Sequence, residues 1–395
     1  MNILFLAPHP FYQTRGTPIA VDMLLRVLAE RGESVDLITY HEGSDVQYEQ
    51  LTVRRTPKFP FGKDIPPGFS LKKLVADGLM AVQAVRQSWR KRYHVVHAVE
   101  ESVFIALVLK LMFRVPYVYD MDSSLAQQMM EKYPRLRRCA FLLNYCESVA
   151  LKHALVVLPV CDSLGHIALS HGHPHVRTLH DVPMFDEGSH EESDSLPRGV
   201  QQGRLRVMYV GNLETYQGID LLLESFSLIS SEADHVDLVI VGGAKEDIHK
   251  YQEKSNALGV QDRVSFLGQK PICRLASFLA EADILVSPRI HGHNTPMKLY
   301  SYLQSGKPIV ATNLPTHTQV LTKEVGILAD PYPDAFAQGM LCLIHDQELA
   351  LKVGLAGKQL VEQKFSYAAF REKVNDLYNW LETDREPSTT IPGAG

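Results

Sequence analysis

The sequence predicts an α/β protein built from two doubly wound, parallel sheets, and three observations lead to this fold class. Short runs rich in Val, Ile and Leu alternate with longer amphipathic segments, which is typical of parallel strands covered by helices on both faces. The alternation runs twice along the chain, and a polar, acidic segment at 186–203 separates the two rounds. With 395 residues, the chain is long enough for two such domains.

Each strand is expected where a short apolar run comes before turn residues. In the first half, strands are expected at 3–7, 34–40, 94–99, 117–120 and 155–160. In the second half, they are expected at 206–211, 237–242, 264–267, 283–287, 308–312 and 326–328. Helices are expected between them, for example at 18–31, 218–230 and 276–281, where apolar residues recur at helical spacing.

The segment 186–203 (DEGSHEESDSLPRGVQQG) is the expected linker, so the domains are predicted at 1–190 and 200–365. They should face each other across a central cleft, with ligands at the carboxyl ends of the strands. A last helix at 366–383 is expected to pack back toward the first domain. The polar Pro/Gly tail at 384–395 is expected to be disordered.

Composition excludes several classes of protein. Lys and Arg number 40 against 45 Asp and Glu, a net charge of −5, which argues against a general nucleic-acid-binding protein. Five cysteines at irregular spacing, with no CxxC, predict reduced thiols rather than a disulfide framework or a zinc site. The longest apolar run, 104–113, is too short for a spanning helix and contains Lys110, and the N-terminus is expected to form a strand rather than a signal peptide. We therefore expect a cytoplasmic protein that touches the inner face of the membrane only peripherally.

Glycines at predicted strand ends in the second half point to anion binding. The strand VMYV ends at Gly211, and Gln217-Gly218 come before a helix, so backbone can approach a ligand closely and free N–H groups can meet an anion. Gly242 ends the next strand in the same way but is a weaker signal, because turns in such folds commonly contain glycine.

The segment 287–312 (SPRIHGHNTPMKLYSYLQSGKPIVAT) carries the strongest signal. Thr295 and Pro296 are typical of an N-cap and first helical position, which puts Lys298 in the first turn. A cation there opposes the helix dipole unless an anion is bound. The alternative is an exposed surface lysine, but the converging polar loop with Arg289 and Asn294 favours an anion site.

These motifs resemble a known family. The run GNLxxxQG, followed by NTPMKLYSYLxSGKPIVAT, is similar to the C-terminal half of group 1 (GT4) glycosyltransferases, and TRGTP at 14–18 and HVVHAV at 94–99 fit the N-terminal half. The resemblance implies the GT-B fold and a nucleotide-sugar donor bound mainly by the C-terminal domain. It also implies transfer with retention and no metal or other cofactor.

The residues carried over from the family include several departures. Asn212 and Gln217 stand where the family has Arg and Lys facing the diphosphate, and His293 and Ser301 stand where it has paired glutamates. Asp122 takes the place of a histidine that lies against the sugar. The resemblance implies catalytic roles for Asp122 and His293 and acceptor-side roles for Arg15, Gly16, Thr17 and His97. The implied donor site comprises Gly211, Asn212, Gln217, Gly218, Gly242, Arg289, Asn294, Thr295, Pro296, Lys298 and Ser301, with Arg289 and Lys298 replacing the missing phosphate charges.

Two polar groups admit a functional and a structural interpretation. His97 is placed at a strand end beside Glu100 and Glu101, where it would serve acceptor chemistry or simply be solvated. Four histidines follow one another before the linker, but the glycine and proline between them favour a connection over a metal site; they are His171, His173, His175 and His180.

The segment 70–94 (SLKKLVADGLMAVQAVRQSWRKRYH) is basic and partly amphipathic, and two interpretations stay open. It forms either a helix that faces the core and has a solvated basic end, or a surface that lies on an anionic bilayer. Its apolar positions include Leu74, Leu79, Val82 and Val85, and its basic ones are Lys72, Lys73, Arg86, Arg90, Lys91 and Arg92. The aromatic loop before it contains Phe59, Phe61 and Phe69, which suit an acceptor or lipid.

The sequence thus predicts a retaining glycosyltransferase that moves a sugar from a nucleotide-diphosphate sugar to a glycan or lipid-linked acceptor, with an anionic membrane surface as a further partner. The alternative is a GT-B protein without transfer activity that binds nucleotide or glycan as a partner subunit. GT-B sugar-nucleotide epimerases are a third class, but their acidic catalytic side chains cannot be placed here.

Overall fold

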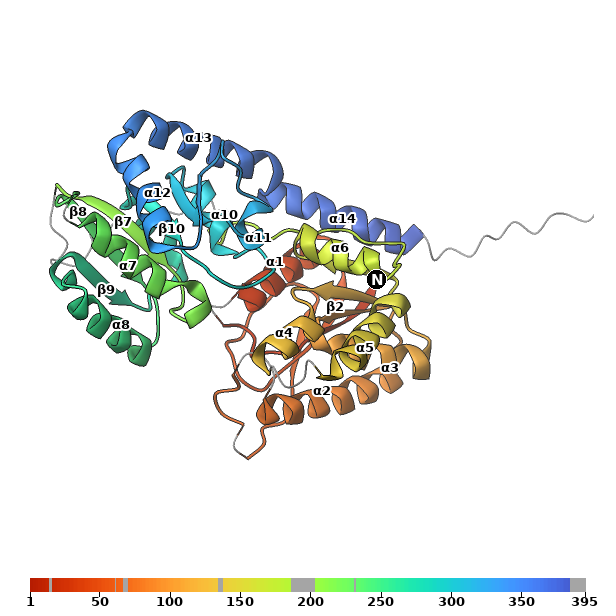
Figure 1. Ribbon diagram of the computed structural model, residues 1–395. Coiled ribbons are helices and arrows are strands. Elements are labelled where there is room, and N and C mark those ends of the chain that lie inside the picture. The colour runs from red at the N-terminus through yellow and green to blue at the C-terminus, as the bar shows by residue number, and fades with distance from the viewer. Residues whose placement is uncertain are drawn as a thin grey trace, which may run out of the picture. The chain divides into compact units, whose positions relative to one another are not determined.

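The computed structural model describes residues 1–13, 16–60, 62–66, 70–133, 138–185, 203–230 and 232–383. The predicted linker, apart from Gly203, and the predicted disordered tail lie outside these residues. The chain forms two compact units (Figure 1). The first contains Met1–His180 together with the C-terminal helix from Phe370 onward, and the second contains Asp181–Ala369.

The first unit is built on a six-stranded parallel sheet of order β3-β2-β1-β4-β5-β6. Its strands are β1 (Asn2–Ala7), β2 (Ser34–Thr39), β3 (Leu51–Arg55), β4 (Val95–Val99), β5 (Tyr117–Met121) and β6 (Val156–Pro159). Its helices are α1 (Gly16–Glu30), α2 (Leu71–Arg90), α3 (Val103–Phe113), α4 (Leu125–Lys132), α5 (Ala140–His153), α6 (Asp162–Ser170) and α14 (Tyr367–Thr383).

Helices cover both faces of this sheet. Leu4 and Leu6 of β1 pack in one core with residues of α2, α3 and α5. Phe5 points to the opposite face, where its ring stacks on His97 at 4.4 Å between centroids. There the hydroxyl of Tyr378 in α14 lies 2.9 Å from Nδ1 of His97, so the C-terminal helix is fastened to the sheet of the first unit.

The second unit repeats the plan with a parallel sheet of order β12-β11-β10-β7-β8-β9. Its strands are β7 (Leu205–Val210), β8 (Val236–Val241), β9 (Val264–Gly268), β10 (Ile284–Ser287), β11 (Ile309–Thr312) and β12 (Ile327–Ala329). Its helices are α7 (Ile219–Ile229), α8 (Lys245–Ala257), α9 (Leu275–Ala280), α10 (Lys298–Gln304), α11 (Pro315–Thr318), α12 (Pro333–His345) and α13 (Gln347–Lys364).

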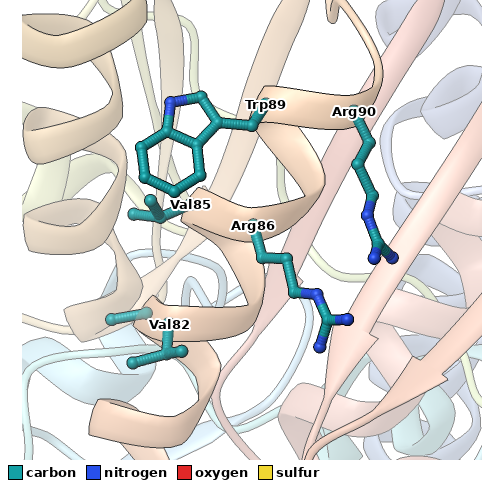
Figure 2. A pocket seen from close by; sticks show the side chains of 6 residues that line it. Val82, Val85, Arg86, Trp89 and Arg90 are labelled. Carbon is teal, nitrogen blue, oxygen red and sulfur yellow. The ribbon is translucent and has the colours of Figure 1, made fainter.

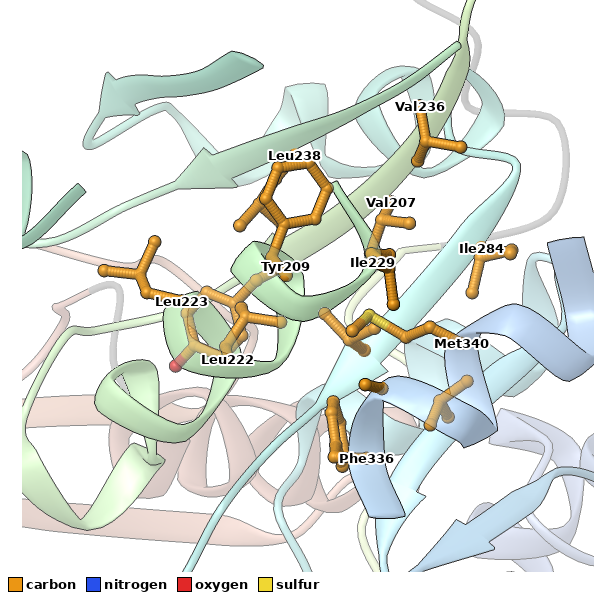
Figure 3. Close-up of a cluster of buried hydrophobic side chains, with 14 of the residues drawn as sticks. Val207, Tyr209, Leu222, Leu223, Ile229, Val236, Leu238, Ile284, Phe336 and Met340 are labelled. Atoms are coloured by element: carbon orange, nitrogen blue, oxygen red, sulfur yellow. The ribbon is translucent and has the colours of Figure 1, made fainter. Parts of the chain in front are cut away.

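One of the two cores of the second unit lies between this sheet and the helices α7 and α12 (Figure 3). Tyr209 and Leu238 of neighbouring strands meet Leu222 of α7, and Phe336 and Met340 enter from α12. All five side chains are fully buried. At about 25 cal/mol per Å² of apolar surface, such burial is the main term that stabilises the unit.

The predicted fold class is confirmed, and every predicted strand is present with bounds that agree to within two residues. Strand β3 was not predicted. Its sequence LTVRR lies at the sheet edge and is only partly buried. A polar contact also holds it, since Arg54 Nε donates to Asp36 Oδ1 of β2 at 3.0 Å. An edge strand held by polar contacts lacks the continuous apolar run that marked the other strands.

The predicted start of the helix at Thr295-Pro296 was wrong, because α10 begins at Lys298 with Met297 as its N-cap. The carbonyl of Asn294 accepts from Thr316 Oγ1 at 2.7 Å, and that of His293 accepts from Gln319 Nε2 at 2.9 Å. The backbone before α10 is therefore held by side chains from the α11 region rather than by helical hydrogen bonds.

Candidate active site

Two glycine turns meet at the carboxyl ends of β7 and β8. The N–H of Gly211 donates to the carbonyl of Val241 at 2.9 Å. A Cβ on Gly242 would lie only 2.0 Å from the carbonyl oxygen of Gly211, and both glycines have positive φ, 151° and 115°. No other residue fits at Gly242, so the predicted glycines form one surface at the strand ends.

A third glycine joins this surface to the end of β10. Gly218 has φ 73° and is the N-cap of α7, and a Cβ there would lie 2.0 Å from the carbonyl oxygen of Pro288. The N–H of Ile290 donates to the carbonyl of Tyr216 at 2.9 Å across the same junction. These contacts hold the loop after β10 against the loop after β7, which are the two motifs that the sequence singled out.

Lys298 lies where the two loops meet. Its side chain is only 8% exposed, and Nζ donates to Oε1 of the predicted site residue Gln217 at 3.1 Å. Nζ also lies 3.9 Å from the centre of the Tyr209 ring, and 3.2 Å from the position that a Cβ on Gly211 would take. The ammonium group therefore faces the glycine turn, and the alternative of an exposed surface lysine is wrong.

Arg289 supplies a second buried cation close by. Its guanidinium donates to Asn294 Oδ1 at 2.9 Å and to the His291 carbonyl at 2.7 Å. It also lies 5.2 Å from the centre of the Tyr216 ring. A Cβ on Gly292 would collide with this guanidinium at 2.1 Å, so Gly292, which the sequence analysis did not single out, makes room for it.

The electrostatics around Lys298 and Arg289 are unusual, because two positive charges lie where water is excluded. Burial lowers the pKa of Lys298 well below its ordinary value, and the positive charge of Arg289 lowers that pKa further. Among the described residues, no carboxylate forms an ion pair with Lys298, and the charge that acts on it is that of Arg289. An anion bound at the glycine turn would supply the missing counter-charge.

Buried polar side chains behind the site hold the strand ends in place. Tyr302 of α10 bonds both to the N–H of Val210 at 2.7 Å and to its carbonyl at 3.2 Å, which fixes the end of β7. His317 bonds to Ser287 Oγ at 2.8 Å and to Thr312 Oγ1 at 3.0 Å, which joins the ends of β10 and β11. Burial lowers the pKa of His317 to about 3, so its ring is neutral. Tyr302 lies within the segment 287–312 that the sequence singled out, whereas no local motif marks His317.

The other predicted donor residues differ in how far they are buried. Ser301 is fully buried, and its Oγ accepts the backbone N–H of Met184 at 3.0 Å. Thr295 is also buried, but its predicted capping role is wrong because the helix begins later. Asn212 and His293 are exposed on the two loops, and Pro296 is buried next to Thr295.

In the first unit, the placement of His97 at a strand end was wrong. His97 is the central residue of β4 and is fully buried. Its two ring nitrogens lie 2.9 Å from the Tyr378 hydroxyl and 3.1 Å from Asp120 Oδ2, so the ring is held inside the unit and does not face an acceptor. The strand continues to Val99 because the whole run VVHAV is buried.

The remaining predicted residues of the first unit are dispersed. Asp122 is half-buried just beyond the carboxyl end of β5. Gly16 begins α1 and is exposed, with no atom within 4 Å of a Cβ added there, and Thr17 is half-buried in the same turn. Arg15 lies outside the described residues. Asp122 and His293 belong to different units.

Charged groups gather instead at the carboxyl ends of β1, β2 and β4. Glu100 follows β4 with φ 48°, which is rare for a residue other than glycine, and it accepts from Ser123 Oγ at 3.2 Å. Lys73 of α2 forms an ion pair with Glu101 and donates to the Pro8 carbonyl at 2.6 Å. Burial, and then the charge of Glu101, raise the pKa of Glu100 to about 7.

Two of the four histidines before the linker lie together, since the backbone N–H of His175 donates to Nδ1 of His173 at 3.1 Å. Nε2 of His173 lies 3.2 Å from the carbonyl oxygen of Ala154, and the ring of His175 lies 5.2 Å from that of Trp380. Within the described residues, no group of three or more His, Cys, Asp or Glu is placed to hold a metal ion. In the same part of the chain, no helix has the length and apolar character needed to cross a bilayer.

Two family models match the two halves of the chain. The model for "Glycosyl transferase 4-like domain" matches residues 15–180, and the model for "Glycosyl transferases group 1" matches residues 192–360. The chain belongs to the group 1 (GT4) glycosyltransferase family. The predicted resemblance is thereby confirmed, and the second model covers both loops that meet at Lys298.

Curated relatives agree with this membership. The D-inositol 3-phosphate glycosyltransferase of Corynebacterium glutamicum is 27% identical over 214 residues, which cover 50% of this chain and 49% of the relative. The chain thus spans about half the length of the curated relatives it matches first.

Two solved structures share the fold. Sucrose-phosphate synthase of Thermosynechococcus elongatus superimposes with a TM-score of 0.78 at 17% identity, covering 97% of this chain and 99% of that one. HepE of Anabaena, solved in complex with UDP, has a TM-score of 0.74 at 15% identity, covering 96% and 100%.

The buried neutral histidine of the second unit predicts acid sensitivity. Because the pKa of His317 is about 3 in the folded protein, the unfolded chain binds one more proton between about pH 6.5 and pH 3. Stability is therefore lost as the pH falls through that window. We expect His317→Gln to lower the melting temperature near neutral pH but to weaken its fall on acidification to about pH 4. Thermal unfolding of the exposed control His235→Gln should follow the wild type at both pH values, and an unchanged acid response of His317→Gln would contradict the assignment.

The raised pKa of Glu100 predicts the opposite dependence. The folded protein holds a proton on Glu100 between the ordinary carboxyl pKa and about 7, so stability is lost as the pH rises through this range. Glu100→Gln should raise the melting temperature at about pH 8 by more than at about pH 5. Glu49→Gln, an exposed carboxyl of the same unit, is the matched control. A pH-independent effect of Glu100→Gln would show that Glu100 is ionised throughout.

Proposed function

We propose that this protein is a retaining glycosyltransferase that moves a sugar from a nucleotide-diphosphate sugar to a glycan or lipid-linked acceptor. Its membership of the group 1 family supports transfer from an activated sugar, and the retaining course is the one that the family resemblance implies. HepE, which shares the fold, has been solved with UDP and with UDP-glucose.

The observation that carries the proposal is the buried amine of Lys298 at the glycine turn. A diphosphate placed against Gly211 would lie beside Nζ and would restore the proton that burial and Arg289 disfavour. Lys298 and Arg289 come from the second motif, and together they supply the charge that Asn212 and Gln217 lack. In this arrangement Gln217 positions the lysine, because its side-chain oxygen accepts the Nζ hydrogen bond.

The same geometry gives the two cations a chemical role. When the bond between the sugar and the diphosphate breaks, negative charge builds up on the leaving phosphate. A lysine and an arginine that are already fixed in a site from which water is excluded stabilise that charge without reorganising. We assign Asp122 of the first unit and His293 of the second unit to the catalytic roles that the family resemblance implies. The glycan or lipid-linked acceptor is assigned to the first unit, whose strand ends carry Glu100 and Glu101.

Replacing the lysine by an uncharged residue of similar length tests the donor site. Lys298→Met should weaken UDP binding by about tenfold to a hundredfold, because a charge-assisted hydrogen bond contributes about 1.5–3 kcal/mol. Binding of uridine, which has no phosphate, should change little. The melting temperature of the free protein should stay the same or rise, because a poorly compensated buried amine is removed.

Calorimetric titration measures both affinities. The control is Lys254→Met on the same unit, because Lys254 pairs with Asp220 and Glu224, both at 2.6 Å, and should not affect UDP. Equal losses for UDP and uridine would place the diphosphate elsewhere. Donor binding without any hydrolysis or transfer from a panel of UDP-, GDP- and ADP-sugars would favour the partner-subunit alternative.

A further inference from the structure

Helix α2 buries small side chains and exposes large apolar ones. The residues it buries are mainly small, namely Ala76, Ala84 and the larger Met80, at i, i+4 and i+8. The opposite stripe points to solvent, where Val82 is 68% exposed and Trp89 is 73% exposed. An amphipathic helix of a globular protein normally buries its large apolar side chains, so the outward stripe needs a partner.

Two neighbouring helices extend this stripe into a face. Helix α3 packs beside α2, and the rings of Trp89 and Phe113 meet edge to face with centroids 6.2 Å apart. Leu111 of α3 is 76% exposed, and Phe141 of α5, which contacts α3, is 83% exposed. We call this surface the apolar face, and its exposed large side chains are Leu71, Leu74, Val75, Val82, Trp89, Phe104, Val108, Leu111, Met112, Phe141, Leu142 and Tyr145. Figure 1 shows the three helices on the same side of the first sheet.

Negative and positive side chains of these three helices lie in different places. Their only carboxylates are turned inward, since Asp77 bonds to the Tyr40 hydroxyl and Glu147 accepts from Ser124 Oγ at 2.9 Å. The exposed charges are basic, and Arg86 and Arg90 stand one turn apart along the flank of the apolar stripe. A surface of large apolar groups edged only by cations fits a partner that is both apolar and anionic.

The two kinds of side chain meet in a surface groove of about 650 Å³ on α2 (Figure 2). Val82, Val85 and Trp89 line one side of the helix, and the guanidinium groups of Arg86 and Arg90 extend from the other side. This is the arrangement in which apolar groups enter the acyl boundary of a bilayer while long basic side chains reach the phosphates.

We propose that the apolar face docks on a bilayer containing anionic phospholipid, with Trp89, Leu111 and Phe141 in the interface and with Arg86 and Arg90 on the lipid phosphates. Two of the basic residues expected in this role are excluded, because Lys73 pairs with Glu101 and Lys91 donates to Asp36 at 2.7 Å. A second copy of the chain fits less well. Pairing two such faces would bring the arginines together without exposed carboxylates from these helices.

The proposal goes beyond the transfer reaction and does not rest on it, so it is tested on the free protein. Wild type is sedimented at low salt with vesicles of phosphatidylcholine, with or without phosphatidylglycerol. Binding should require phosphatidylglycerol and weaken with added salt. The double variant Arg86→Glu and Arg90→Glu should lower the partition coefficient by roughly thirtyfold or more, given the usual contribution of one basic side chain near an anionic surface. The matched control, Lys323→Glu with Lys352→Glu, changes two exposed lysines of the second unit and should bind like wild type.

A spectroscopic readout locates the contact. The chain has two tryptophans, so Trp380→Phe leaves Trp89 as the only reporter. Its emission should shift to shorter wavelength on adding phosphatidylglycerol vesicles, and brominated lipid should quench it. Trp89→Ser should weaken sedimentation, whereas Leu351→Ser, an exposed apolar residue of α13, should not.

Three outcomes would overturn the proposal. The first is no sedimentation of wild type with anionic vesicles at low salt, and the second is equal sedimentation with phosphatidylcholine alone. The third is concentration-dependent dimerisation, measured by light scattering, that Trp89→Ser abolishes while vesicle binding persists. That result would assign the apolar face to a second copy of the chain.

Discussion

The second unit depends on a buried amine whose usual counter-charge is missing. Lys298 lies against the Tyr209 ring and the Gly211 turn, and its ammonium group donates to the neutral side chain of Gln217. Excluding water from a cation is costly unless an opposite charge replaces it. The glycines at 211, 218 and 242 let three strand ends approach closely enough to enclose this group, and Tyr302 and His317 hold those ends in place.

The first unit uses the same sheet architecture for a different purpose. At its strand ends, Glu100 and Glu101 lie near Lys73 of α2 instead of glycine turns around buried cations, so its charges already compensate one another in part. Its outer helices leave an apolar face with a basic edge. The two proposals therefore assign an anionic donor to the second unit and a membrane contact to the first.

The sequence predicted what short-range patterns encode and missed what depends on long-range packing. Apolar runs located the buried strands, whereas the polar edge strand β3 had no such run. The motifs at 211–218 and 287–298 lie together in the structure, but the contact of Lys298 with Gln217 joins residues that are 81 positions apart. His97 appeared to end a strand because its partner Tyr378 lies 281 positions later. The outward orientation of α2 follows from the small Ala76 and Ala84, which allow the helix to approach the sheet, whereas helical spacing alone indicated only that one face was apolar.

Proton uptake on UDP binding tests the central claim most directly. If burial and Arg289 keep Lys298 partly deprotonated in the free protein, a bound diphosphate raises its pKa and the complex takes up protons between the two pKa values. Calorimetric titrations at one pH in two buffers with different ionisation enthalpies give the number of protons, and they are repeated at several pH values below the ordinary lysine pKa of about 10.4. We predict that the wild type takes up more protons on binding UDP than Lys298→Met does. The variant measures the protons that UDP itself exchanges. The same proton count for both proteins at every pH would contradict the account.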